Sequence, residues 1–253
     1  MQEDGAARVF TGVGSRETPA DIGLLMAAIS RKLTQAGWTL RSGAADGADL
    51  AFESGVQAPE RKEIYLPYPG FNGSVSTLHK LMPACYELAS AVHPAWGRCS
   101  DFAKKAHARN AFQVLGYNLL RPADALICWT KDGAVDAASA KNAGGTRTAV
   151  VLANESGIPV FNLQRPAVAA VFREWVGDDL LAQVKPALRM SGAPKSKTPY
   201  SSSPSNSSRP FAQQPPARSP LPESFLQTEP SSPVASALSA SPKPRIRFRA
   251  PGH

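Results

Sequence analysis

A glycine-rich stretch in the second half of the chain has the composition of an anion-binding loop. It consists of Gly144, Gly145, Thr146, Arg147 and Thr148, and an apolar run over 150–153 follows it. A helix that starts here has backbone N–H groups without intrahelical partners, and these donors together with the helix dipole favour a phosphate. The glycines allow close approach, the threonines can cap or donate, and Arg147 can neutralise charge. An ordinary turn before a buried helix would explain the same residues.

A second loop of this kind lies near the start of the chain. It joins an expected strand over 8–11 to an expected helix that starts near Pro19 and ends at Gly37. Its candidate ligands are Gly12, Gly14, Ser15 and Arg16. The position between a strand and a helix is typical of phosphate-binding loops, although neither the full Walker pattern nor GxGxxG is present. A plain turn between the two elements is the alternative.

A third loop follows an expected strand over 38–41 and precedes a short expected helix over 50–54. Its candidate ligands are Ser42, Gly43, Asp46, Gly47 and Asp49. The two aspartates can hold ribose hydroxyls or an ordered water. At the start of a helix they can equally serve as caps, and we expect capping from at least one of them.

The order of the expected elements determines the fold class. Further strands are expected over 63–67, 124–130 and 158–163, and helices over 74–93, 100–120, after residue 144 and over 166–188. Alternating strands and helices predict an α/β, Rossmann-like fold, with a mostly parallel sheet of about five strands and helices on both faces. Ligands of such sheets bind beyond the carboxyl ends of the strands. The three loops are therefore expected to share one anion or nucleotide site.

The net charge of +8 is distributed unevenly along the chain. Residues 1–190 carry a net charge of +2 and residues 191–253 a net charge of +6. The segment 191–253 also holds 13 of the 23 prolines and 15 serines. We therefore expect a folded domain over 1–190 and a disordered, basic tail over 191–253. The tail could bind nucleic acid or an acidic partner, or have no fixed partner.

Metal sites, cofactors and membrane segments have no clear sequence signal. The three cysteines, Cys85, Cys99 and Cys128, show no paired or metal-like spacing, and the four histidines are scattered. The chain has no apolar run of about 18 residues, and its first residues do not resemble a signal peptide. We expect a cytoplasmic protein without a metal, a cofactor or a membrane segment.

Four motifs in order resemble those of the SLOG superfamily, and within it the branch of DNA-processing protein A (DprA). They are Gly14-Ser15-Arg16, the stretch over 42–49, the pair Arg109-Asn110 in the expected helix over 100–120, and the loop over 144–149. The resemblance covers about residues 8–165. It implies a pocket for a phosphate-bearing ligand, which is single-stranded DNA in DprA-like members, and it suggests a homodimer.

Other members of the superfamily leave two alternatives open. Lonely Guy enzymes, which hydrolyse nucleotide N-glycosidic bonds, carry a glutamate shortly after the glycine-threonine loop, where this chain has Val150 and Val151. We therefore expect a non-catalytic protein that binds single-stranded DNA or a nucleotide, and the resemblance to DprA suggests a role in DNA processing or recombination. A phosphoribohydrolase that uses Arg109 with Glu53 or Asp49 is the enzymatic alternative. The second alternative is a sensor or sponge, that is, a protein that detects or sequesters a nucleotide messenger.

Overall fold

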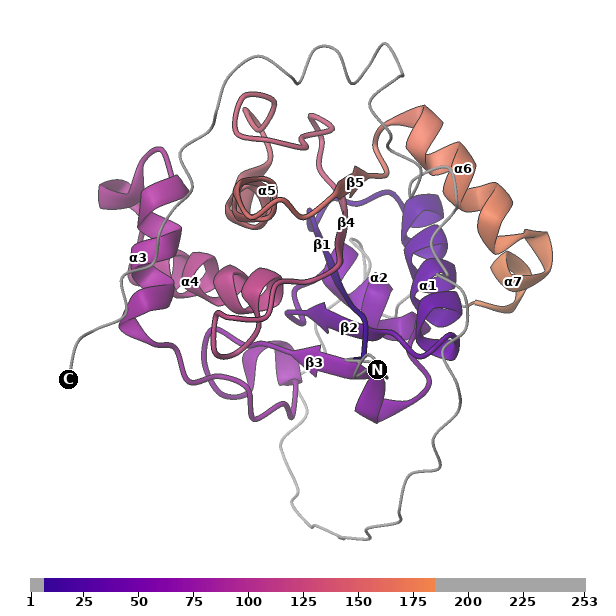
Figure 1. The fold of residues 1–253 in the computed structure, drawn as a ribbon, viewed down its shortest axis with the longest axis horizontal. Coiled ribbons are helices and arrows are strands. Elements are labelled where there is room, and N and C mark those ends of the chain that lie inside the picture. Colours follow the sequence, from indigo (N-terminus) through magenta and orange to yellow (C-terminus); the bar gives the residue numbers. More distant parts are fainter. Residues whose placement is uncertain (1–6, 185–253) are drawn as a thin grey trace, which may run out of the picture. The chain divides into compact units, whose positions relative to one another are not determined.

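A computed structural model describes residues 7–184, and it contains one five-stranded parallel sheet (Figure 1). The strands are β1 (Val9–Gly14), β2 (Thr39–Ser42), β3 (Lys62–Ile64), β4 (Ala125–Trp129) and β5 (Val160–Asn162). Their order is β3-β2-β1-β4-β5, and every neighbouring pair is parallel. The chain therefore changes winding direction between β1 and β4, which is where open α/β sheets bind ligands.

Seven α-helices connect or flank these strands in the described part of the chain. They are α1 (Ala20–Gln35), α2 (Ala48–Gly55), α3 (Pro83–Val92), α4 (Asp101–Leu115), α5 (Arg147–Glu155), α6 (Pro166–Val176) and α7 (Asp178–Gln183). Figure 1 shows α1, α6 and α7 on one side of the sheet and α3, α4 and α5 on the other. The predicted α/β, Rossmann-like fold with helices on both faces is therefore confirmed, and the sheet is parallel throughout.

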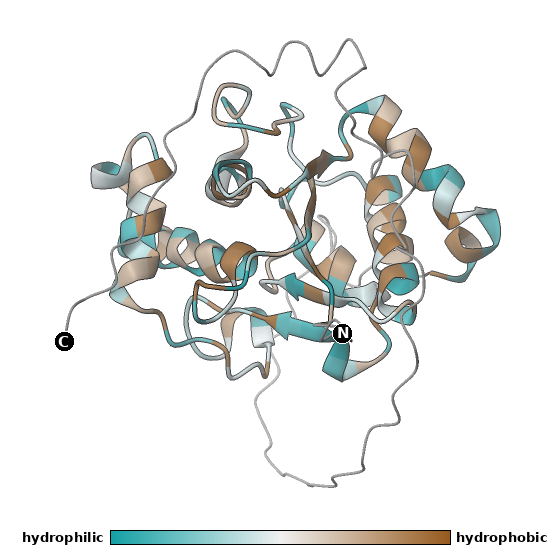
Figure 2. Ribbon diagram, viewed as in Figure 1, coloured by the Kyte–Doolittle hydropathy of each residue, from teal (hydrophilic) through white to brown (hydrophobic). Residues whose placement is uncertain are grey.

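The alternating side chains of β1 face two separate cores. Phe10 lies near Phe52 of α2, with ring centroids 6.4 Å apart. Val13 belongs to the opposite core, where it joins Phe112 of α4 and Val150 of α5. Successive side chains of a strand point to opposite faces of the sheet. The apolar residues of β1 therefore let helices pack against both faces. In Figure 2, α1 and α6 carry both brown and teal surfaces, as expected for helices with one face on a core.

The helix α4 has clear start and stop signals. The Ser100 hydroxyl oxygen accepts a hydrogen bond from the Ala103 N–H at 3.2 Å, which caps the first turn. The helix ends before Gly116, whose φ of 77° lies in the left-handed region that glycine adopts readily. Both signals stand in the sequence, and α4 is the helix that carries most of the site described below.

Two expected helices have different bounds in the structure. The expected helix over 74–93 begins only at Pro83, because proline is favoured in the first turn of a helix and breaks an interior. The expected helix over 166–188 is divided into α6 and α7 by Gly177, which has a φ of 81°. The predicted domain boundary after residue 190 and the predicted tail over 191–253 lie outside the described residues. Within 7–184, no helix combines the length and the hydropathy that a bilayer span requires.

Candidate functional site

A cavity of about 460 Å³ lies at the carboxyl ends of β1 and β4. It is bounded by residues 13–17 after β1, by one stripe of α4 and by the glycine-rich residues 142–146 before α5. Nine of the predicted ligand residues line it: Gly14, Ser15, Arg16, Asp49, Arg109, Asn110, Gly144, Gly145 and Thr146. The carboxyl ends of parallel strands meet at one edge, which is why these distant segments converge.

A buried ion pair forms the floor of this cavity. The Arg109 Nη1 lies 3.5 Å from Asp49 Oδ2, and the residues are 6% and 3% exposed. Burial raises the pKa of Asp49 to about 6, although Arg109 and backbone N–H groups of Ala45 and Gly14 act in the opposite direction. Burial also lowers the pKa of Arg109, and Asp49 opposes that shift. The floor therefore combines a permanent cation with a carboxyl group that titrates close to neutral pH.

Several polar side-chain atoms on this floor have no hydrogen-bond partner in the described part of the chain. Arg109 Nη1 donates to the Tyr65 carbonyl at 3.2 Å, but the buried Arg109 Nε has no hydrogen-bond partner among residues 7–184. The same holds for both amide atoms of Gln113, one turn further along α4. Buried polar groups are nearly always hydrogen-bonded in native proteins. Since both residues line the cavity, a polar ligand could supply the partners.

The absence of a side chain at Gly43 makes room for this floor. A Cβ atom at position 43 would lie 1.2 Å from Arg109 Nη1 and 2.6 Å from Gln113 Nε2. Gly43 does not line the cavity itself, so its role is to let the guanidinium of Arg109 pass over the backbone. Gly43 therefore contributes to the site by leaving room for Arg109, whereas the sequence predicted that Gly43 would contact the ligand.

The glycine-rich loop is held from α4 and is open toward the cavity. The Asn110 side-chain N–H donates to the Gly145 carbonyl at 2.9 Å. Gly144 and Gly145 are exposed, and no atom lies within 4 Å of a Cβ built on either. No side chain caps the 3₁₀ turn Gly144–Thr146 or the start of α5. The loop lies at a helix start, where backbone N–H groups commonly bind anions, but the Thr146 N–H already donates to the Ala143 carbonyl at 3.2 Å.

The Arg147 side chain binds backbone carbonyl groups outside the cavity. Its Nη1 donates to the carbonyl of Ala137 at 3.2 Å and to that of Ala140, and Arg147 does not line the cavity. The side chain thus ties the loop over 131–143 to the start of α5. The basic residues that line the cavity are Arg16, Arg109 and Lys131.

Close backbone packing accounts for the glycines of the first two loops. A Cβ at Gly14 would lie 2.6 Å from the Cβ of Ala48, and one at Gly47 would lie 2.5 Å from the Ser15 carbonyl oxygen. A Cβ at Gly12 would meet Phe52 at 2.6 Å. These glycines bring the loops together, and among them Gly14 alone lines the cavity.

The polar residues of these loops are partly engaged in the fold. Ser15 N–H donates to the Trp129 carbonyl at 3.0 Å, and Ser15 Oγ accepts from Glu17 N–H at 3.0 Å. Ser42 Oγ donates to the Gly12 carbonyl at 2.7 Å, and Asp46 accepts from the Asn72 amide at 3.4 Å. Ser42 and Asp46 lie outside the cavity lining, so the structure supports them as loop-ordering residues.

The lining residues that sequence reasoning missed include four with an aromatic or polar side chain in α4 or after β4: Phe102, His107, Gln113 and Lys131. Phe102, His107 and Gln113 lie on α4 with Arg109 and Asn110, and helical spacing could have found them, since Gln113 is four positions after Arg109 and His107 three before Asn110. His107 donates to or accepts from the Thr148 hydroxyl at 2.8 Å, which places the predicted Thr148 behind the cavity wall. Burial, His93 and Arg109 lower the pKa of His107 to about 4, so its ring is neutral at pH 7.

Comparisons with models of protein families, with curated proteins and with solved structures found no match for this chain. The function is therefore inferred below from the geometry of the site.

Proposed function

We propose that the cavity binds a nucleotide without catalysis, either as a free nucleotide or as one unit of single-stranded DNA. The observation that carries the proposal is the convergence of the buried Arg109, the unpartnered Gln113 amide and the uncapped start of α5 on one cavity. A phosphate on the loop over 144–146 would accept from backbone N–H groups, as anions do at helix starts. Arg16, Arg109 and Lys131 would supply the positive charge.

An aromatic surface at the cavity favours a nucleotide over a bare phosphate. Phe102 lines the cavity and is 42% exposed. Its ring centroid lies 6.2 Å from those of Tyr68 and Phe71, so the exposed ring is supported from behind. A base can stack on such a ring. The volume of about 460 Å³ lies within the usual range of small-molecule sites.

The resemblance to DprA points in the same direction. Together with it, the site supports a role in DNA processing or recombination with single-stranded DNA as the partner, and the cytoplasmic location stays a prediction. A homodimer and a contribution of the basic segment 191–253 to binding remain predictions. The net charge of +2 over 1–190 favours a local contact at the cavity over a broad electrostatic track.

A charge placed on the glycine-rich loop tests this proposal. Gly145 has no positive φ, and a Cβ there meets no atom within 4 Å, so a side chain can be added without strain. The full chain should bind labelled oligo-dT or compete for it with a mononucleotide, and Gly145→Asp should weaken binding more than 10-fold by repelling the phosphate. Gly145→Asn, which has the same shape without the charge, is the matched control.

The salt dependence of that binding identifies the form of the ligand. A steep fall of affinity with salt indicates several phosphates of a strand, because each neutralised phosphate releases counterions. A shallow dependence with effective competition by a mononucleotide indicates a single bound nucleotide. Equal binding by wild type and Gly145→Asp would contradict the proposed site.

Asp49 supports one enzymatic alternative, hydrolysis of a nucleotide N-glycosidic bond. Its carboxyl group lines the cavity, lies 3.5 Å from Arg109 and has a pKa near 6, as suits a general acid or base. Glu53, the other candidate, pairs with Lys62 at 2.8 Å and does not line the cavity. If the protein releases base from nucleotides, Asp49→Asn should abolish the release and Glu53→Gln should preserve it. Absence of release from the wild type removes this alternative.

A further inference from the structure

Two histidines and a cysteine converge beside the cavity although they are separated in sequence. His93 follows α3, Cys99 lies two residues before α4, and His107 lies within α4. Their ligand atoms all lie within 4.8 Å of one another. The whole chain contains four histidines and three cysteines, so this group gathers three of its seven strongest metal-binding side chains. Their sequence spacing matches no common metal motif, which is why the sequence predicted no metal.

The distance between Cys99 and His93 fits a tetrahedral metal ion. Cys99 Sγ lies 3.8 Å from His93 Nδ1 and 3.7 Å from His93 Nε2. Zinc bonds of about 2.3 Å to sulfur and about 2.0 Å to nitrogen place such ligand atoms about 3.6 Å apart. Cys99 is also the only one of the three cysteines that is not buried, so an ion can reach it from solvent.

Hydrogen bonds around the histidines suit the same use. His107 Nδ1 lies 2.8 Å from the Thr148 hydroxyl, which can accept the ring proton and leave the lone pair of Nε2 for a metal. Such a partner on the second ring nitrogen is common for metal-bound histidines. His93 Nδ1 accepts from the Ala95 N–H at 3.2 Å, and metal binding through either ring nitrogen would replace this single long hydrogen bond.

We propose that His93, Cys99 and His107 form a zinc site with three protein ligands. The fourth position is open to water or to a donor atom of another ligand, as in zinc sites that are not purely structural. The ion brings two positive charges and the Cys99 thiolate one negative charge. Zinc therefore adds a net charge of +1 next to a cavity that His107 also lines. The proposal does not depend on the identity of the cavity's ligand.

Metal titration of the full chain tests this site without any nucleotide. The chelator-treated protein should bind one equivalent of Zn²⁺ in competition with a chromophoric chelator. With Co²⁺ it should show a thiolate-to-cobalt charge-transfer band and the intense visible bands of a tetrahedral ion. Zinc should also protect Cys99 from alkylation, which peptide mass spectrometry can follow at this one cysteine.

Single substitutions separate a metal site from a packed aromatic cluster. The rings of His93 and His107 lie 4.4 Å apart beside Trp96, so a purely structural role is the competing explanation. Cys99→Ser and His93→Gln should each weaken zinc binding about 100-fold or more, since loss of an outer partner alone costs about 10–100-fold. Thr148→Val should weaken it about 10-fold.

Two variants serve as matched controls, His79→Gln and Cys85→Ala, because neither residue belongs to the group. Both should bind zinc as the wild type does. Cys99 is only half-buried, so Cys99→Ser should keep the native circular dichroism spectrum. Wild-type protein that binds no zinc, or Cys99→Ser protein that retains full affinity and the cobalt band, would overturn the proposal.

Discussion

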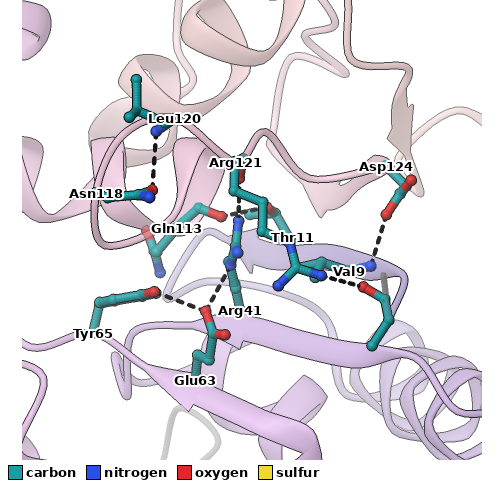
Figure 3. Close-up of polar contacts among 11 residues, drawn as sticks. Val9, Thr11, Arg41, Glu63, Tyr65, Gln113, Asn118, Leu120, Arg121 and Asp124 are labelled. Atoms are coloured by element: carbon teal, nitrogen blue, oxygen red, sulfur yellow. Dashed lines mark hydrogen bonds and ion pairs between the residues drawn. The ribbon is translucent and has the colours of Figure 1, made fainter. Parts of the chain in front are cut away.

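Two arginines are buried on the same side of the sheet, and their surroundings differ. Arg41, on β2, is 2% exposed, and its guanidinium contacts Glu63 and the Arg121 carbonyl (Figure 3). Its Nε lies 2.7 Å from Glu63 Oε2, and its Nη1 donates to the Arg121 carbonyl at 2.7 Å. Tyr65 donates its hydroxyl to the same Glu63 oxygen at 2.7 Å. This guanidinium links β2, β3 and the segment before β4.

Arg109 is as deeply buried but has weaker partners. Its ion pair with Asp49 is 3.5 Å long, its hydrogen bond to Tyr65 is 3.2 Å long, and its Nε has no partner among residues 7–184. It also lines the cavity described above, whereas Arg41 does not. Burying an incompletely paired charge destabilises a protein. The difference favours a structural role for the charge of Arg41, and under the proposed function the charge of Arg109 binds the ligand.

The largest expected effect is on the stability of an Arg41 variant. Arg41→Met removes a buried cation and leaves Glu63 and the Arg121 carbonyl without their partner. The free energy of unfolding should fall by about 3 kcal/mol, while the folded fraction binds oligo-dT normally. Denaturant titration followed by circular dichroism measures the change. A loss below about 1 kcal/mol would show that this network is replaceable.

The substitution Gly43→Ala should displace Arg109 and weaken ligand binding. The new Cβ would lie 1.2 Å from Arg109 Nη1, so the guanidinium must move away. We expect about a 30-fold loss of oligo-dT or nucleotide affinity, or about 2 kcal/mol. Gly97→Ala, where a Cβ meets no atom within 4 Å, should bind as the wild type does. Unchanged affinity in Gly43→Ala would mean that the position of Arg109 does not matter for binding.

The pH dependence of stability should reveal Asp49. Its folded pKa, about 6, exceeds its ordinary value of 3.8, so the folded state binds the proton more tightly than the unfolded state. The contribution of this group is fully present below pH 4 and is lost as the pH rises through 6. Relative to Asp49→Asn, the wild type should therefore lose roughly 2–3 kcal/mol between pH 4 and pH 7. Parallel stability profiles of the two proteins would contradict this assignment.

A smaller effect is expected from loosening the glycine-rich loop. Asn110→Ala removes the 2.9 Å hydrogen bond to the Gly145 carbonyl without removing any charge. Affinity should fall about 5-fold, or about 1 kcal/mol, because the loop must then be ordered by the ligand. The matched control is Asn118→Ala, whose side chain accepts from Leu120 N–H in an exposed loop. Equal losses in both variants would exclude a specific role of Asn110.

The strands and part of the candidate site could be predicted from the sequence. All five strands and the convergence of the three loops follow from local patterns, because parallel strands end at one edge of the sheet. The residues Arg16, Asp49 and Arg109 were identified from loops and motifs, and the structure places them in the cavity lining.

The direction of individual side chains could not be predicted. Arg147 is a residue type expected to bind phosphate, yet it binds the carbonyls of Ala137 and Ala140, which depends on the path of the preceding loop. Gly43 has a role only because Arg109, 66 positions later, passes over it. The convergence of His93, Cys99 and His107 likewise depends on how the chain turns between α3 and α4. These are tertiary contacts without a local sequence signal.

The most direct test of the account substitutes the Arg109 pair without leaving a buried carboxylate. The double variant Arg109→Met with Asp49→Asn should be measured beside Arg41→Met for both affinity and unfolding. We expect the double variant to lose at least 30-fold in affinity for oligo-dT or a nucleotide, which is about 2 kcal/mol. Its free energy of unfolding should stay within about 1 kcal/mol of the wild-type value. Unaltered binding together with a stability loss as large as that of Arg41→Met would contradict this expectation, and Arg109 would then be a second structural arginine.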